Sequence, residues 1–259
     1  MNNLYIFSPL NQFEVTNLIG INAPVLGNLH LNLTNLSLYS IFVVLTILGL
    51  HIYANNDNKI IPNNWSISLE SSFASLNTMV RDQIGVNKGS GGEKYFPFIY
   101  SIFFYILIAN LISNVPYSFA VTASGVVSLG LSLTIFIGVT ILALSIHGLK
   151  FFAFFIPSGT PLNLVPLLVL IELVSYLARA VSLGVRLFAN ITAGHTLLKI
   201  LSTYLFKLFT GNLLVAILTL IPFAIFLALV GLEIAVSLIQ AFVFTLLVCS
   251  YLRDAIELH

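Results

Sequence analysis

The sequence predicts an all-α polytopic membrane protein with about five membrane-embedded helices and one amphipathic surface helix, ending in a long, strongly tilted helical hairpin. Three observations support this fold class. Hydrophobic residues make up 58% of the chain and charged residues only 7%, whereas about a quarter of an ordinary soluble domain is charged. Several apolar runs reach the roughly 20 residues that a helix needs to cross a bilayer. The last two apolar runs are too long for one upright crossing each.

The first half of the chain predicts three crossings and the surface helix. The apolar run 36–54 is long enough for one crossing, and the segment 55–94 that follows holds many of the charged residues. Inside that segment, apolar residues recur at near-helical spacing, which predicts an amphipathic helix on the membrane surface; these residues are Ile67, Phe73, Leu76, Met79 and Val80. Residues 95–156 predict two more crossings, separated by a break at Pro116.

The second half predicts the hairpin. If helical, residues 162–206 are about 67 Å long and residues 212–252 about 61 Å long, interrupted only by Pro222. A helix of that length fits a hydrocarbon core of about 30 Å only if it is tilted by about 60°, against an ordinary average of about 20°. Either each run breaks into two crossings, or the two form a hairpin lying nearly flat. We favour the hairpin, because "KLFTGN" (207–212) is the only clear loop signal between them.

Composition and motifs exclude several functions. A net charge of +1 gives no long-range attraction to nucleic acid. Cys249 is the only cysteine, which excludes disulfides within the chain and argues against a thiolate metal cluster. The glycine-rich stretch "GVNKGSGGEK" (85–94) lacks the spacing and the Lys-Ser/Thr ending of a phosphate-binding loop, so we interpret it as a flexible turn. No catalytic nucleophile or metal-ligand pattern stands out, and we expect a non-catalytic protein without a cofactor.

The basic residues predict the orientation in the membrane. If the first crossing starts outside, six basic residues fall on the inner side and two on the outer side. The inner ones are Lys59, Arg81, Lys88, Lys94, Lys150 and Arg253, and the outer ones are Lys199 and Lys207. This places the N-terminus outside and the C-terminus inside.

Ionisable residues stand inside the last two apolar runs, where an arginine at the helix centre costs about 2.5 to 3.5 kcal/mol or more. Glu172, Arg179 and Arg186 are spaced by seven and Asn190 follows by four, so a helix places them along one stripe. His195 stands nine residues beyond Arg186 and faces nearly the other way.

Folding the second arm back near residue 210 predicts two polar clusters. Glu233 and Gln240 come to the level of Arg186, and Asp254 comes towards Glu172. His195 with Glu233 then leans to the outer side, Glu172 with Asp254 lies on the inner side, and Arg186 lies between the clusters. Histidine and carboxylates exchange protons, whereas arginine stays protonated. Arg186 is therefore suited to repel a proton or to hold a carboxylate from another helix, and only Glu233 offers a partner within the chain.

Structural interpretations remain open beside these. Arg179 and Glu172 could neutralise one another, although seven residues is a long reach. Asn190 and Gln240 could be helix-packing contacts. We interpret His30, His51 and His147 as packing or interface residues.

Three stretches closely resemble subunit a of F-type ATP synthases: "PLLVLIELVSYLARA" (166–180), "SLGVRLFANITAGH" (182–195) and "GLEIAVSLIQAFVF" (231–244). "SPLNQFE" and "SYLRDAIELH" are similar to fungal mitochondrial members. The resemblance implies a proton-translocating stator subunit beside a rotating c-ring of small hairpin subunits, each with a buried carboxylate. Protons would enter through one half-channel, ride the ring and leave through a second, while other subunits carry out the ATP chemistry.

The resemblance also implies roles for single residues. Arg186 resembles the essential arginine that faces the ring carboxylate, with Asn190 and Gln240 as polar neighbours. His195 and Glu233 match the entry half-channel. Many bacterial relatives have an acid at the position of His195 and a histidine at that of Glu233, an exchange that preserves one titratable pair. Two further residues match the matrix-side exit half-channel; these are Glu172 and Asp254.

The resemblance implies a place in the cell as well. It predicts removal of residues 1–7, a single membrane domain over 8–259, and a multi-pass protein of the mitochondrial inner membrane. The N-terminus would lie in the intermembrane space and the C-terminus in the matrix. The implied partners are the c-ring, peripheral-stalk and other Fo subunits, lipid, and a second copy of the whole complex.

Two other functions stay open at this point. A secondary transporter could bind an anionic substrate at Arg186, although the sequence shows neither an internal repeat nor a pair of broken helices. A purely structural membrane scaffold would need none of the ionisable pairs.

Overall fold

The computed structural model describes residues 8–23, 29–54, 62–84, 91–155, 164–211 and 218–256. These residues form six α-helices: α1 (Asn35–Ala54), α2 (Asn64–Ile84), α3 (Gly91–Ser113), α4 (Gly125–His147), α5 (Val165–Phe209) and α7 (Leu220–Ile256). Five of them, all except α2, are long and apolar enough to cross a membrane. This confirms the predicted all-α polytopic membrane fold. The predicted propeptide (1–7) and most of the glycine-rich turn lie outside the described residues.

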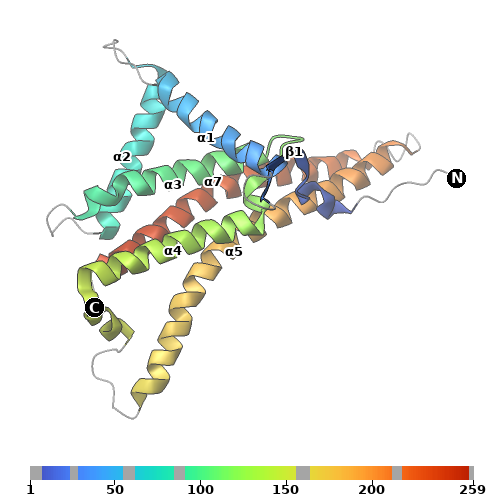
Figure 1. Ribbon diagram of the computed structural model, residues 1–259. Coiled ribbons are helices and arrows are strands. Elements are labelled where there is room, and N and C mark those ends of the chain that lie inside the picture. The colour runs from blue at the N-terminus through green and yellow to red at the C-terminus, as the bar shows by residue number, and fades with distance from the viewer. Residues whose placement is uncertain are drawn as a thin grey trace.

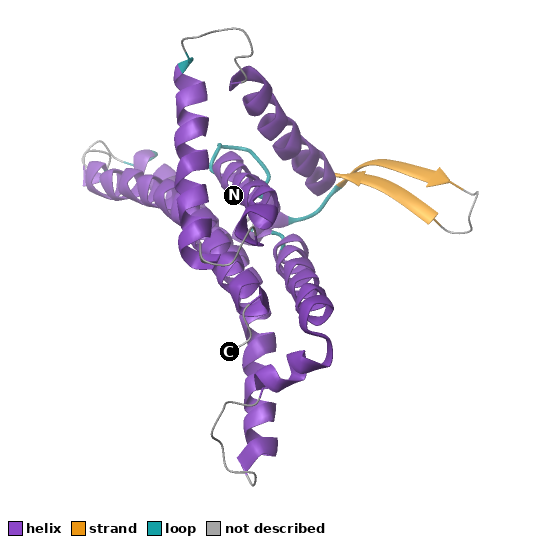
Figure 2. Cartoon of the chain, turned by 90° about the vertical axis from the view of Figure 1, so that its left-hand side faces the viewer, coloured by secondary structure: helices purple, strands orange, loops and turns teal. Residues whose placement is uncertain are grey.

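A short N-terminal region comes before α1 and includes a β-hairpin that we did not predict. The 3-10 helix η1 (Pro9–Phe13) is followed by strands β1 (Asn17–Ala23) and β2 (Leu29–Thr34). The strands pair antiparallel, with Asn17 opposite Thr34, and Figure 2 shows the hairpin projecting from the start of α1. In "LHLNLT" apolar and polar residues alternate, which is the period of a strand.

Helices α1 and α2 lie at one side of the molecule (Figure 1). Only Val43 and Ala54 of α1 are buried, so most of its apolar surface faces outward. Helix α2 buries one face of its second half in the core it shares with α3 and α7, while Ile67 and Phe73 stay exposed. The predicted amphipathic helix is therefore present. Its placement on the membrane surface stays a prediction.

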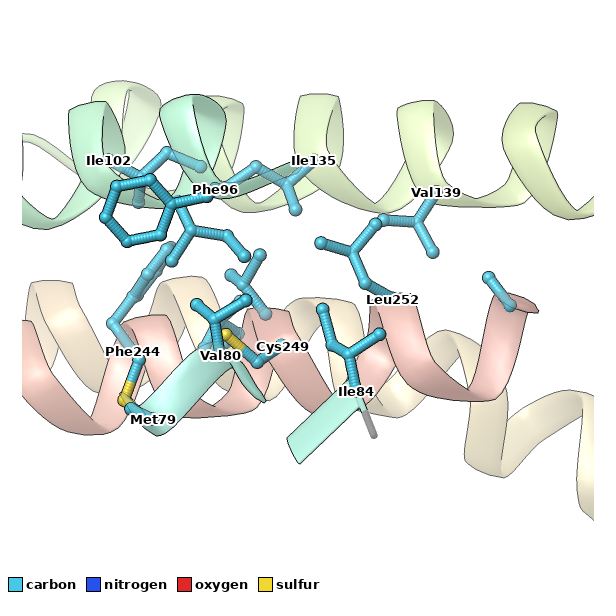
Figure 3. Packing of buried hydrophobic residues seen from close by; sticks show 14 of the residues in the cluster. Met79, Val80, Ile84, Phe96, Ile102, Ile135, Val139, Phe244, Cys249 and Leu252 are labelled. Atoms are coloured by element: carbon cyan, nitrogen blue, oxygen red, sulfur yellow. The ribbon is translucent and has the colours of Figure 1, made fainter. Parts of the chain in front are cut away.

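The core surrounds the second half of α7. Figure 3 shows side chains from α2, α3, α4 and α7 meeting there. Phe244, Val248 and Cys249 of α7 are fully buried in this cluster. From Leu220 to Leu232, by contrast, α7 buries no side chain. The second half of α7 therefore packs in the bundle, whereas its first half lies outside the bundle, beside α5 (Figure 1).

The last two helices form the predicted hairpin. Helix α5 is a continuous helix of 45 residues and α7 one of 37, so neither run breaks into two crossings. Pro222 lies in the first turn of α7, where its missing N–H removes no intrahelical hydrogen bond. The tilt of this hairpin against the bilayer stays a prediction.

The connection from α3 to α4 places residues next to the hairpin. Helix α3 ends at Ser113, before the predicted break at Pro116. The chain then turns through Tyr117, which has a φ of 67°, into the buried 3-10 helix η3 (Val121–Ala123). Helix α4 ends where Gly148 adopts a φ of 56°, a left-handed conformation that glycine takes without strain.

Candidate functional site

Helices α5 and α7 hold polar side chains in three layers along their contact. In the outer layer His195 Nε2 lies 3.7 Å from Glu233 Oε1. In the middle layer Asn190 Nδ2 donates to Gln240 Oε1 over 2.9 Å. In the inner layer Arg179 lies beside Asp254. The layers extend over about 24 Å of α5 at 1.5 Å per residue, most of the thickness of a hydrocarbon core.

In the outer pair Glu233 is buried and His195 is partly buried, and a glycine makes room for the acid. Glu233 is only 8% exposed. A Cβ atom built on Gly194 would stand 2.7 Å from Glu233 Oε1, closer than real Cβ contacts allow. The distance between His195 Nε2 and Glu233 Oε1 is too long for a direct hydrogen bond, and neither atom has a hydrogen-bond partner among the described residues. The geometry suits a bridging water or a transferred proton.

The middle layer contains the amide pair and, one turn away, Arg186. The Arg186 side chain is exposed, and no hydrogen bond or ion pair joins it to another residue in the described part of the chain. Gly184, two residues away and so on nearly the opposite side of the helix, is buried against Ser132 and Leu129 of α4. Arg186 therefore points out of the bundle, where another protein can meet it.

One sequence prediction about this layer is wrong. We placed Glu233 level with Arg186, but Glu233 lies opposite Gly194 and His195. Helix α5 continues to Phe209 and α7 begins only at Leu220, so the hairpin reverses later than the assumed position near 210. The later reversal shifts the register of the two arms by about two turns.

The inner layer is a three-residue network rather than a pair of acids. Arg179 Nη1 lies 3.1 Å from Asp254 Oδ2, and its Nη2 lies 3.5 Å from Glu172 Oε1. The separation of seven residues that we called a long reach is bridged, because two long side chains span two helical turns. A cavity of about 20 Å³ adjoins Arg179 and Asp254, which is about the space that one water needs.

Further polar groups, which the sequence analysis missed, lie behind the outer pair. Asn114 Nδ2 donates to Ser237 Oγ over 3.0 Å, and Ser237 Oγ donates to the carbonyl oxygen of Glu233 over 2.9 Å. The fully buried Asn110 accepts a hydrogen bond from Thr122 Oγ1 at 2.9 Å. The available signal was the spacing of Asn110 and Asn114, four residues apart at the end of an apolar run.

Close packing of α4 on α5 fixes which face of α5 turns outward. A Cβ atom on Gly184 would stand 2.5 Å from Ser132 Oγ and 3.0 Å from the Cα atom of Leu129. Small residues permit such approach between membrane helices. Because Gly184 faces α4, Arg186 is turned away from it.

Two of the other histidines have structural contacts, as predicted. The ring of His51 lies between Ile47 O (2.8 Å) and Tyr100 Oη (3.0 Å). His147 Nε2 donates to the carbonyl oxygen of Ala255 over 3.1 Å, near the end of α7. The side chain of His30 lies outside the described residues.

The fold and these layers define a class: an all-α polytopic membrane protein with ionisable side chains gathered between its two longest helices. Residues 37–253 match the family model described as ATP synthase A chain. The chain is 62% identical to ATP synthase subunit a of Mycosarcoma maydis, over 98% of each chain. It is 52% identical to subunit a of Emericella nidulans, over 98% of each chain, and 49% identical to that of Kluyveromyces lactis, over 100% of each chain.

The chain therefore belongs to the ATP synthase subunit a family. It is a membrane subunit of the synthase, not the part that carries out the ATP chemistry.

Proposed function

We propose that this member of the family acts as the proton-translocating stator of an F-type ATP synthase through two offset half-channels that load and unload a rotating c-ring. The observation that carries the proposal is the position of Arg186. It is exposed and unpaired among the described residues, and it lies between the His195–Glu233 pair and the Arg179–Glu172–Asp254 network. A cation on an apolar surface calls for a partner that supplies the opposite charge.

The entry half-channel is assigned to the outer layer. His195 and Glu233 both bind and release protons, and their 3.7 Å separation allows one water to link them. The buried position of Glu233 keeps this exchange away from lipid. Protons leaving this pair would reach the ring through the middle layer of Asn190 and Gln240.

Arg186 is assigned the role of barrier and counter-charge. An opposite charge nearby favours the ionised form of a ring carboxylate, so that the carboxylate releases its proton as it passes. Arginine does not release its own proton. Protons therefore cannot pass directly between the half-channels and must travel with the ring. Each charge that moves across 100 mV supplies about 2.3 kcal/mol to drive rotation.

The exit half-channel is assigned to the inner layer. Glu172 and Asp254 offer acceptors for the released proton, and Arg179 holds both carboxylates in place. The adjoining cavity of about 20 Å³ has space for one water beside Asp254. We assign Arg179 to positioning, because a permanent cation cannot relay protons.

The proposed setting is the mitochondrial inner membrane, with the N-terminus in the intermembrane space and the C-terminus in the matrix. The excess of basic residues on the inner side supports this orientation. The proposed partners are the c-ring against Arg186, peripheral-stalk and other Fo subunits, lipid along α1, and a second copy of the complex. Removal of residues 1–7 remains part of the proposal, and mass measurement of the N-terminus tests it.

Replacement of Arg186 tests the mechanism. We expect Arg186→Ala to abolish ATP-driven proton pumping by the assembled complex in liposomes while passive proton leak is sustained or rises, because the barrier between the half-channels is gone. Arg253→Ala is the matched control, since Arg253 is also exposed but stands at the end of α7. Unchanged pumping by Arg186→Ala would refute the mechanism.

A further inference from the structure

Six buried side-chain atoms among the described residues have no hydrogen-bond partner, and contacts join three of their residues, Asn114, Glu233 and His195, into one region. The atoms belong to Gln12, Asn110, Asn114, Thr192, His195 and Glu233. Asn114 reaches Glu233 through Ser237, and Glu233 adjoins His195. A buried polar atom without a partner is costly. Several such atoms around the His195–Glu233 pair indicate a site that holds water, which typically makes about three hydrogen bonds when buried.

Gln12, one of these six residues, lies on the N-terminal helix η1, which our assignment of the entry half-channel did not use. Its neighbour Phe13 joins η1 to the site: the ring of Phe13 packs edge-on against the ring of His195, with centroids 6.3 Å apart and planes at 74°. Phe13 also packs on a small apolar cluster formed by Ala120, Ala123 and Ile191. Phe13 therefore covers one side of the His195 ring.

The segment is held in this position from both ends. At its start, Ser8 Oγ accepts a hydrogen bond from the backbone N–H of Leu10. Beyond its end, Asn35 Nδ2 donates to the carbonyl oxygen of Glu14 over 3.1 Å, and Asn35 Oδ1 accepts from the N–H of Thr16. Asn35 is the first residue of α1. The first contact orders the start of η1, and the second ties its end to α1, so the segment is held by more than the apolar packing of Phe13 on α5.

The neighbouring Gln12 supplies a polar group that packing does not require. Its Nε2 is buried and unpartnered, although an apolar side chain of the same size would fill the space without that cost. Thr192 Oγ1 and His195 Nε2 are also buried without a partner. They stand three residues apart on α5 and so share a face. Together these groups supply enough donors and acceptors to hold a buried water.

A hollow lies beside η1 and begins about one turn of α5 beyond His195. It has a volume of about 280 Å³ and is lined by Pro9 of η1 and by residues of α5 beyond His195, among them Lys199, Thr203 and Lys207. A hollow of this size with two basic side chains holds several waters. It gives bulk water a route to the edge of the segment that covers His195.

We propose that the N-terminal segment Ser8–Glu14 is a built part of the entry site: Phe13 covers the His195 ring, and Gln12, with Thr192, holds the water through which protons reach His195. This inference rests on the proposed function, since it extends the half-channel assigned to His195 and Glu233. It makes Gln12 and Phe13 positioning residues.

The first experiment measures proton flux through the assembled complex in liposomes at a fixed membrane potential. We expect Gln12→Leu to slow the flux several-fold, because leucine fills the space but holds no water, and Gln12→Asn to restore much of it. Asn11→Leu is the matched control, because Asn11 is exposed on the same short helix. A merely structural role for Gln12 predicts no difference between the leucine and asparagine variants.

The second experiment does not depend on activity. We expect Phe13→Ala to raise several-fold the rate at which diethyl pyrocarbonate modifies His195 in the intact complex, measured by mass spectrometry, with the modification of His147 as the internal reference. Phe13→Leu keeps most of the apolar contact and should change the rate little.

The outcomes separate the inference from the function on which it rests. If His195→Ala and Glu233→Ala slow the flux but Gln12→Leu and Phe13→Ala change neither flux nor His195 reactivity, the inference is overturned and the proposed function stands. If His195→Ala and Glu233→Ala leave the flux unchanged, the proposed function itself fails.

Discussion

At the scale of single residues, the exposed Arg186 and the buried Glu233 depend on different neighbours. Arg186 needs an outward face of α5, which the packing of Gly184 against α4, on nearly the opposite side of the helix, supplies. Glu233 needs space, which Gly194 supplies, since any Cβ there would stand 2.7 Å from the carboxylate. A glycine on one helix thus sets the position of an acid on the other.

This contact gives a prediction for Gly194. We expect Gly194→Ala to displace the Glu233 carboxylate from His195 and to lower ATP-driven proton pumping by about tenfold or more, as displacement of a proton-transfer group does. Because one methyl group is small, the complex should still assemble. Pumping by the purified complex at equal protein amount measures the effect.

Gly231→Ala is the matched control for this substitution. Gly231 lies two residues from Glu233 on α7, and a Cβ there meets nothing within 4 Å. Equal pumping by the two alanine variants would show that the close approach to Glu233 does not matter for proton flow.

At the scale of elements, the packing of α4 against α5 decides how α5 is rotated. Ser128 and Ser132 of α4 are buried at 0% and 1% exposure, and Gly184 of α5 lies against Ser132 and Leu129. Small residues of this kind let two membrane helices approach closely, where packing and not water drives association. The rotation so fixed is what directs Arg186 outward.

Gly184→Ala should push α4 and α5 apart. The new Cβ would stand 3.0 Å from the backbone of Leu129, which cannot give way as a side chain can. Overpacking of this kind costs about 1 to 3 kcal/mol, so we expect a lower thermal stability of the assembled complex and less of it in the membrane. Gly138→Ala on α4 serves as the control, because a Cβ at Gly138 meets nothing within 4 Å. Equal melting temperatures would contradict the role of this contact.

At the scale of the whole molecule, the polar layers do not form a complete path by themselves. The outer and inner layers are separated along α5 by about 24 Å, and Arg186, which stands between them, faces out of the bundle. In the proposed mechanism the c-ring carries the proton across this gap. The chain without a ring therefore has two partial routes and no connection.

This arrangement predicts that the purified chain in liposomes conducts no more protons than empty liposomes, whereas the assembled membrane sector conducts them at the same potential. The measurement is proton flux reported by an internal pH dye. A secondary transporter would work alone or as a homo-oligomer. Flux or anion exchange by the isolated chain would therefore favour the transporter.

The sequence by itself determined the fold class, the unbroken long helices and the residues that carry charge at membrane depth. These are local properties, because apolar runs, helical spacing and the cost of a buried charge are all visible along one chain. The stripe of Glu172, Arg179 and Arg186 and the opposed His195 follow from the helical period alone.

The sequence also grouped His195 with Glu233, but only the tertiary structure decided the levels at which the two helices meet. The register between α5 and α7 sets Glu233 level with His195 rather than with Arg186, and it gives Arg179 two acids. Register depends on where the hairpin reverses and on close contacts such as that at Gly194, which the spacing within one helix does not reveal. The contributions of Asn114 and of Phe13 likewise came from residues distant in sequence. Such contacts are fixed by the packing of several helices at once, and no single stretch of the chain specifies them.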